Sequence, residues 1–276
     1  MDLPDNTAQR QSRSFLLAVE DTQFLLRDEM RPTRFALEYA KAELSLRDWG
    51  VRSTVVVFGS ARVSSVERAR QLTSLAKTPQ EVEHARAALA SSVWYEQARA
   101  FARIVSERGG ALGSVQGKRD NVIATGGGPG IMEAANRGAA DAGAPSIGFN
   151  ITLPREQEPN AYSTPELTFR FHYFAMRKMH FAMRARALAV FPGGFGTLDE
   201  LFELLTLQQT EKAPEMPIVL VGRPYWTQVI NFEVMIAEGM VSRQDLRLFE
   251  IVDDAEAAWK SLARRGLPIP EVPHGS

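Results

Sequence analysis

The chain of 276 residues contains no cysteine and only four histidines. The missing thiols exclude disulfides, cysteine nucleophiles and zinc sites built on cysteine, and they are compatible with a reducing compartment, so we expect a cytoplasmic protein. The charges are nearly balanced, with 32 basic and 33 acidic residues. No global field therefore attracts a nucleic acid polymer or an anionic membrane, and we expect neither as a partner.

Long apolar runs are also missing. No stretch approaches the roughly 18 residues that a membrane-spanning helix needs. The N-terminal sequence MDLPDNTAQR lacks the basic region and apolar stretch of a signal peptide. We therefore expect a protein that neither spans a membrane nor is exported. The remaining composition, 45% apolar and 24% charged, is that of an ordinary globular protein with a sizeable core.

Short apolar runs alternate with helical segments from residue 51 onward. We expect strands within STVVVFGSAR, DNVIATGGGPG, APSIGFNI, ELTFRFHY, ALAVFPGG and MPIVLVG. Continuous apolar runs of this length are typical of a parallel sheet that is buried on both faces. The fold class that follows is α/β: a Rossmann-like, doubly wound, mainly parallel sheet with helices on both faces, plus an N-terminal helical extension.

The domain boundaries follow changes in this pattern. Residues 1–50 form the helical extension, 51–265 the α/β domain and 266–276 a fraying tail. The extension contains apolar residues at helical spacing before Gly50, namely Phe35, Tyr39, Ala42 and Leu46. Within the α/β domain, residues 64–90 are rich in Ala, Glu, Arg and Leu. They predict an inserted helical pair before a separate core helix at WYEQARAFARIVSER.

Three glycine-rich turns follow expected strands: GSAR (Gly59–Arg62), GGGPG (Gly126–Gly130) and PGGFG (Pro192–Gly196). At the carboxyl ends of parallel strands, such turns present backbone N–H groups and helix N-termini to an anion. Each turn alone is equally consistent with a tight turn that needs positive φ. Together they favour a site for a mononucleotide or sugar phosphate, with Thr197 as a hydroxyl donor and Arg62 as a candidate cation.

The common nucleotide motifs fit poorly. GGGPG is not the G-x-G-x-x-G of dinucleotide enzymes, and the next strand ends in IGFN without an acidic residue to bind a ribose. The nearest approach to a phosphate-binding Walker loop, GSVQGKR, has Arg119 where Ser or Thr binds magnesium. Neither NAD nor ATP is supported.

The segment FAMRKMHFAMRARALAVF predicts a helix that runs into a strand, with Arg177, His180 and Arg184 on one helical face. His180 has no acidic neighbour in the sequence, so we do not assign it as a general base. Thr197 and Glu200 have the spacing of a capping box, in which both side chains satisfy backbone N–H groups at a helix start. The local sequence favours this structural role of Glu200 over a catalytic one.

Two longer motifs favour a catalytic role of Glu200 instead. PGGFGTLDE matches P-G-G-x-G-T-x-x-E, and it occurs with an upstream Arg177-Lys178 pair and the turn TGGGPGIMEAANRGA. Over roughly residues 54–222 the chain thus resembles the LOG family, phosphoribohydrolases that include the cytokinin-activating enzymes. That family often carries the label "possible lysine decarboxylase".

The resemblance implies hydrolysis of the N-glycosidic bond of a nucleoside 5′-monophosphate to a free base and ribose 5-phosphate. It implies Arg177 and Glu200 as catalytic residues, no metal ion, no cofactor, and a homo-oligomer of at least two subunits. The substrate-binding positions that it implies are Gly59, Ser60, Gly127, Gly128, Gly130, Met132, Glu133, Lys178, Gly193, Gly194, Gly196 and Thr197.

Two departures leave the base open. The second turn is GGGPG instead of the GGGxxG of the short plant-like members, and both the extension and the insertion exceed their minimal fold. The chain resembles the longer bacterial branch, so the base is either a cytokinin or an ordinary purine or pyrimidine.

Two other functions compete with hydrolysis. The first is a non-catalytic nucleotide or molybdenum-cofactor carrier, which would use the phosphate turns without chemistry from Glu200. The second, lysine decarboxylation with pyridoxal phosphate, needs a lysine placed for a Schiff base, and nothing around Lys178 indicates one.

Overall fold

The computed structural model describes residues 4–113, 117–153 and 158–270. Its centre is a seven-stranded sheet in the order β4-β3-β2-β1-β5-β6-β7, in which all neighbouring pairs are parallel. The strands are β1 (Thr54–Phe58), β2 (Val122–Thr125), β3 (Ser146–Ile151), β4 (Thr168–Phe171), β5 (Ala185–Val190), β6 (Ile218–Val221) and β7 (Phe249–Val252). The sheet confirms the predicted fold class, and each of the six expected strands overlaps one of these.

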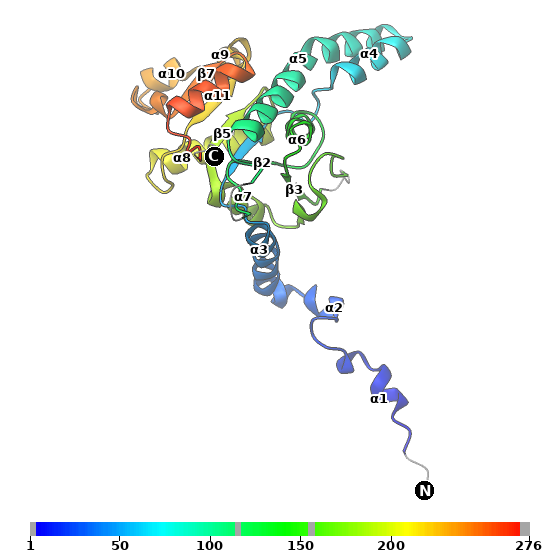
Figure 1. Ribbon diagram of the computed structural model, residues 1–276. Coiled ribbons are helices and arrows are strands. Elements are labelled where there is room, and N and C mark those ends of the chain that lie inside the picture. Colours follow the sequence, from blue (N-terminus) through cyan, green and yellow to red (C-terminus); the bar gives the residue numbers. More distant parts are fainter. Residues whose placement is uncertain (1–3, 114–116, 154–157, 271–276) are drawn as a thin grey trace, which may run out of the picture.

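Helices cover both faces of the sheet (Figure 1). One face carries α5 (Pro79–Arg108), α6 (Ile131–Asp141) and α11 (Ala255–Arg264). The other carries α3 (Arg31–Asp48), α7 (Phe174–Arg184), α8 (Phe195–Gln209) and α9 (Arg223–Val229). Strand β1 shows why: Val55 and Val57 pack into the first layer, whereas Val56 and Phe58 pack into the second. Every residue of this strand is buried, which explains its continuous apolar sequence.

Shorter elements complete the described chain. They are α1 (Thr7–Gln11), η1 (Arg13–Phe15), α2 (Thr22–Leu25), η2 (Asp28–Met30), α4 (Val66–Leu75), η3 (Pro165–Leu167), α10 (Phe232–Ala237) and η4 (Asp245–Leu248). Within the described ranges, no helix combines the length and apolar composition needed to cross a membrane.

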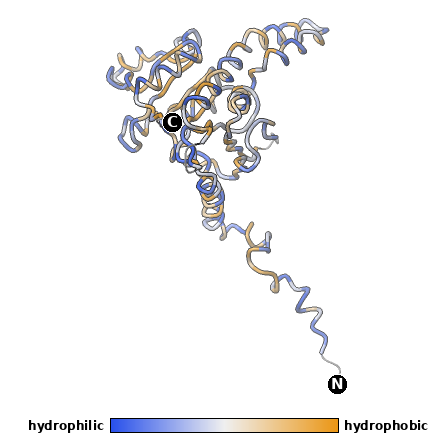
Figure 2. The backbone as a smooth tube through the Cα atoms, in the orientation of Figure 1, coloured by the Kyte–Doolittle hydropathy of each residue, from blue (hydrophilic) through white to orange (hydrophobic). Residues whose placement is uncertain are grey.

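Residues 4–30 run away from the body of the molecule (Figure 1). None of the residues in α1, η1, α2 and η2 is buried, and the apolar side chains of Phe15, Leu17 and Val19 are exposed. Figure 2 shows hydrophobic as well as hydrophilic stretches along the backbone of this segment. Helix α3 follows and packs on the body through buried Ala42 and Leu46, in agreement with the expected amphipathic helix.

The insertion differs from the expectation. Helix α4 is separate, but its expected partner and the expected core helix form one continuous helix of 30 residues, α5. It begins at a capping box of Thr78 and Glu81 with Pro79 in its first turn. After Pro79 the segment contains no further proline and no glycine, so nothing in the sequence ends the helix before Arg108.

The C-terminal part of the chain also differs. Strand β7 was not predicted, because its sequence FEIV is short and includes Glu250, whose carboxylate binds Ser261 and Arg264 of α11. The first residues of the predicted tail are packed: Leu267 is buried, and the carbonyl of Pro268 accepts a hydrogen bond. Residues 271–276 of that tail lie outside the described residues.

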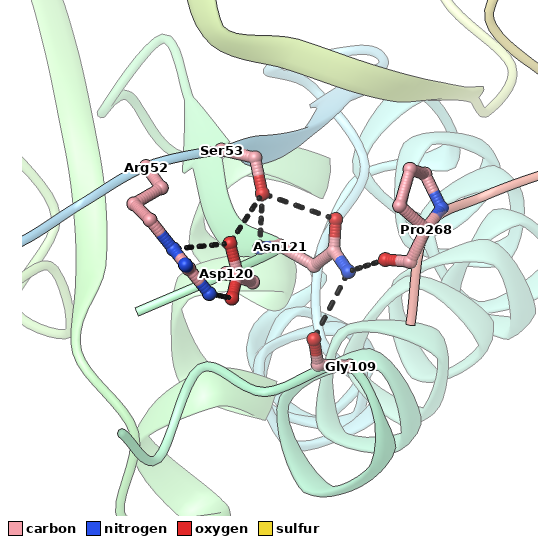
Figure 3. A network of polar contacts seen from close by, with 6 residues as sticks. All are labelled: Arg52, Ser53, Gly109, Asp120, Asn121 and Pro268. Carbon is pink, nitrogen blue, oxygen red and sulfur yellow. Dashed lines mark hydrogen bonds and ion pairs between the residues drawn. The ribbon is translucent and has the colours of Figure 1, made fainter. Parts of the chain in front are cut away.

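A buried asparagine holds this C-terminal segment against the sheet (Figure 3). Asn121, just before β2, donates from Nδ2 to the carbonyls of Gly109 at 2.9 Å and Pro268 at 2.7 Å. Its backbone has a φ of +52°, a left-handed conformation that asparagine tolerates better than most residues. The end of α5, the start of β2 and the C-terminal segment therefore depend on one amide group.

We expect Asn121→Ala to lower the free energy of unfolding by about 2 to 4 kcal/mol, because the buried carbonyl of Gly109 and the partly buried hydrogen bond to Pro268 lose their donor and alanine disfavours this backbone conformation. Urea unfolding followed by circular dichroism measures the change. The control is Arg52→Ala, which removes a half-exposed ion pair with Asp120 in the same network and should cost less than about 1 kcal/mol. Equal effects of the two substitutions would contradict this account.

Candidate active site

The strand order reverses beside β1, which pairs with β2 on one side and β5 on the other. Ligands of open α/β sheets bind at the carboxyl ends of strands at such a reversal. A pocket of about 650 Å³ lies at this place and is bordered by the ends of β1, β5 and β6. Its lining includes nine residues implied by the family motifs: Gly59, Ser60, Met132, Arg177, Gly193, Gly194, Gly196, Thr197 and Glu200.

The three glycine turns meet at the backbone of Ser60. Its N–H donates to the carbonyl of Pro192 at 2.9 Å, and its carbonyl accepts from the N–H of Ile131 at 3.1 Å. Gly130 packs directly on this residue, since a Cβ there would lie 2.3 Å from the Ser60 carbonyl oxygen. Its φ of +74° also favours glycine. The first turn thus joins the second and third into one junction.

Helix α8 begins three residues earlier than the capping-box interpretation requires. Its N-cap is Gly194, without a side-chain hydrogen bond, and Phe195 is its first residue. Thr197 is therefore the third helical residue and Glu200 the sixth, so the predicted capping box is wrong. The N–H groups of Thr197 and Leu198 donate to the Gly194 carbonyl, whereas those of Phe195 and Gly196 precede the first intrahelical bonds.

Glu200 does not cap the helix; it lines the pocket from the second turn of α8. Its side chain is 5% exposed. Burial raises the pKa of its carboxyl group from 4.5 to about 7, although the positive charges of Arg177 and Lys178 act in the opposite direction. A carboxyl group with this pKa is partly protonated at neutral pH, as a general acid or base requires.

Arg177 contributes the positive charge from α7. Its Nε donates to the carbonyl of Phe149 in β3 at 2.8 Å, and its guanidinium lies 5.3 Å from the ring centroid of Phe181. Burial lowers its pKa, and the negative charge of Glu200 opposes that shift. A Cβ at Gly126 would lie 2.4 Å from Nη2, so the first glycine of GGGPG is needed to admit this arginine.

Other motif positions lie outside the lining of this pocket. The Nζ of Lys178 forms ion pairs with Asp199 at 2.8 Å and Glu203 at 3.0 Å. Glu133 accepts a hydrogen bond from the hydroxyl of Tyr95 at 2.7 Å. Gly127 packs against Asn150, and Gly128 accepts a hydrogen bond from Asn160 through its carbonyl. Gly130 acts through the junction described above.

The one-face grouping of Arg177, His180 and Arg184 does not produce a common site. His180 is 1% exposed and lies among the rings of Tyr39, Phe149 and Phe171, where burial lowers its pKa. Arg184 binds Glu43 of α3, with Nη2 2.7 Å from Oε1. Both residues connect α7 to α3, and no triad or larger group of potential metal-ligating side chains occurs in the described part of the chain.

The pocket contains further residues that the motifs did not assign. Arg62, already a candidate cation, lines it, and so do Phe58, Phe195, Leu198 and Tyr225. The hydroxyl of Tyr225 donates to the carbonyl of Gly193 at 2.5 Å. The sequence signal for Tyr225 is a polar aromatic residue four positions after the end of a strand, in GRPYW, and this pattern is too common to single out the residue.

The fold and the pocket together define an α/β protein with a ligand site at the reversal point of a parallel sheet. Residues 132–262 match the model of the family described as "Possible lysine decarboxylase". This range contains the Arg177-Lys178 pair and PGGFGTLDE, two of the features on which the resemblance rests. Over these residues the chain is similar to this family, which is the LOG family that the motifs indicated.

Solved structures provide two further comparisons. The X-ray structure named TM1055, from a structural genomics consortium, is 20% identical, with 77% of this chain and 99% of that chain covered and a TM-score of 0.47. The molybdenum cofactor binding protein from the phototrophic bacterium Rippkaea orientalis is 15% identical, with 78% and 95% covered and a TM-score of 0.45. A search of curated protein sequences finds no significant match.

The raised pKa of Glu200 predicts a pH-dependent stability difference between the protein and Glu200→Gln. Well below pH 4.5 the carboxyl is protonated in the folded and unfolded chains, so its ionisation contributes no difference. As the pH rises from 4.5 through 7, the unfolded chain releases this proton more readily than the folded one. Up to about 3 kcal/mol of stability is then lost from the protein but not from the variant.

Thermal unfolding of both proteins between pH 5 and 8.5 measures this difference, and the variant should gain melting temperature relative to the protein as the pH increases. The same substitution at exposed Glu166 controls for removal of a negative charge. A difference between Glu200→Gln and the protein that stays constant over this range would contradict the assigned pKa.

Proposed function

We propose that the protein hydrolyses the N-glycosidic bond of a nucleoside 5′-monophosphate and releases a free base and ribose 5-phosphate. The observation that carries this proposal is the buried carboxyl of Glu200, with a pKa of about 7, in the same pocket as the Ser60 junction of glycine turns. The carboxyl supplies the chemistry, and the junction supplies a binding place for the phosphate.

Several donors support phosphate binding at the start of α8. The N–H groups of Phe195 and Gly196 precede the intrahelical hydrogen bonds, and the positive end of the helix dipole lies at the same point. The hydroxyls of Ser60 and Thr197 line the pocket beside them, together with Arg62. A phosphate monoester dianion matches this set of donors and charge.

In the proposed reaction, the bond between C1′ and the base nitrogen breaks, and the base leaves with the electron pair. The sugar becomes an oxocarbenium-like cation, which the ionised carboxylate of Glu200 stabilises. Water adds to C1′ and transfers a proton to Glu200, which releases it to solvent, and the departing base takes up a proton from solvent. Arg177 stabilises the negative charge that develops on the base as it leaves.

Burial increases the effect of both side chains. Charges interact more strongly in a site from which water is excluded, and Phe58, Met132 and Leu198 contribute apolar surface to this pocket. The bound phosphate lies away from the bond that breaks, so its binding energy is available to position C1′ against Glu200. Lys178, held by two carboxylates, lies outside this lining and does not support Schiff-base chemistry.

A carrier of nucleotides or of a related cofactor is the competing proposal, because the Ser60 junction would bind a phosphate without any chemistry from Glu200. The base of the substrate is also open between a cytokinin and an ordinary purine or pyrimidine. Turnover and binding of the Glu200 variant separate a hydrolase from a carrier, and turnover of different nucleotides identifies the base.

We expect the purified protein to release free base from at least one of AMP, GMP, CMP, UMP and isopentenyladenosine monophosphate, detected by chromatography. Glu200→Gln should reduce kcat at least 1,000-fold, since the amide can neither stabilise the cation by charge nor accept a proton, and should still bind the nucleotide. Glu203→Gln, a nearby carboxylate outside the pocket lining, is the matched control. Nucleotide binding without turnover by the protein would favour the carrier.

The pKa of Glu200 also predicts the pH profile of hydrolysis. Because the ionised carboxylate is the active form, kcat/KM should fall about tenfold per pH unit below a pKa near 7 and level off above it. The second pKa of a substrate phosphate, about 6, lies roughly one unit lower, so the two limbs are separable. A rate constant that is flat between pH 6.5 and 8 would exclude this role.

A further inference from the structure

Tyr225 lies on the wall of the pocket, at the start of α9, and belongs to none of the glycine turns. Its hydroxyl donates to the carbonyl oxygen of Gly193 at 2.5 Å. This hydrogen bond joins β6 and α9 to the turn that precedes α8. It adds a side-chain hydrogen bond to the two backbone hydrogen bonds of Ser60 that join the turns.

The position of this hydroxyl is fixed by a rigid helix start. Trp226, the next residue, is fully buried, and its Nε1 donates to the carbonyl of Val221 at 3.1 Å. Gly222, the N-cap of α9, has a φ of +102° and donates through its N–H to Val252 of β7 at 2.7 Å. A side chain whose helix is bound to two strands in this way loses little further freedom when it forms a hydrogen bond.

The carbonyl that Tyr225 binds belongs to the most easily reoriented peptide of the turn. The peptide between Gly193 and Gly194 has glycine on both sides, so steric hindrance to its rotation is small. Rotation by half a turn would exchange the directions of the Gly193 carbonyl and the Gly194 N–H. In the observed orientation the Gly193 carbonyl is directed at Tyr225 and the Gly194 N–H is directed to the opposite side. After the rotation the Gly193 carbonyl would be directed to that opposite side.

Neighbouring carbonyls of the turn are held by backbone groups. The carbonyl of Pro192 accepts from the N–H of Ser60, and that of Gly194 accepts from the N–H groups of Thr197 and Leu198. The carbonyl of Gly193, which lies between these two in the sequence, accepts its hydrogen bond from a side chain, that of Tyr225. The orientation of the Gly193–Gly194 peptide thus depends on Tyr225.

We propose that Tyr225 is a positioning residue for phosphate binding: its hydroxyl holds the Gly193 carbonyl away from the anion and so keeps the N–H groups at the start of α8 available to a phosphate monoester. This inference rests on the proposed function for the identity of the ligand, but not for the geometry. It assigns Tyr225 an effect on the affinity for phosphate-bearing ligands and no part in the chemical step.

Tyr225→Phe tests the proposal, because it keeps the ring and removes the hydroxyl. Calorimetric titration of the full chain with ribose 5-phosphate should show a Kd about tenfold higher in the variant, the effect of losing one such hydrogen bond. In turnover assays KM for the nucleotide should rise by a similar factor, with kcat within about threefold. Titration with adenosine, which has no phosphate, should give the same affinity in both proteins.

Tyr173→Phe is the matched control, since its hydroxyl also makes one hydrogen bond, with Arg34 at 2.9 Å, outside the pocket lining. A merely structural role of Tyr225 would lower the melting temperature and alter the binding of adenosine and ribose 5-phosphate together. A Kd for ribose 5-phosphate within twofold of that of the unsubstituted protein would overturn the proposal.

The outcomes separate this inference from the proposed function. If the unsubstituted protein binds ribose 5-phosphate through Tyr225 but hydrolyses no nucleotide, hydrolysis fails and the positioning role stands. If it hydrolyses a nucleotide and Tyr225→Phe behaves identically, the positioning role alone fails. Absence of ribose 5-phosphate binding in the unsubstituted protein contradicts both.

Discussion

The two backbone hydrogen bonds of Ser60 are the interaction on which the pocket depends. They join turns that are far apart in the sequence, at the ends of β1 and β5 and at the start of α6. The contact is close enough that Gly130 cannot carry a side chain, since a Cβ would lie 2.3 Å from the Ser60 carbonyl. Because backbone groups make the junction, glycines at its contact points matter more than the side chains around it.

A buried carboxyl group, that of Glu200, lies in the same pocket as this junction, and its burial does not stabilise the fold. The carboxyl of Glu200 is ionised less readily than in water, so we expect its ionisation to cost stability as the pH rises from 4.5 to about 7. A buried carboxyl that is not engaged in capping its helix is typical of a functional site and unusual for a structural one. Arg177 is a partly buried cation whose Nε donates to a strand carbonyl, so its charge is complementary to that of Glu200.

The sequence was sufficient for six of the seven strands and for the three turns, because buried parallel strands and glycine-rich strand ends leave direct composition signals. The sequence led to a wrong start for α8. Two glycines near the helix start have poor helix propensity, so the N-cap was expected at Thr197 instead of Gly194. The sequence did not reveal the continuity of α5, the short strand β7 or the role of Tyr225. Tyr225 is 32 residues from Gly193, and such a distant contact leaves no local pattern.

In the proposed function, the start of α8 binds the phosphate of a ligand whose C1′ then lies against Glu200. A crystal structure of the protein with ribose 5-phosphate tests it most directly. The account predicts the phosphate at the N–H groups of Phe195 and Gly196 and the hydroxyls of Ser60 and Thr197, with C1′ within about 4 Å of the Glu200 carboxyl. A phosphate bound elsewhere, or a sugar directed away from Glu200, would contradict it.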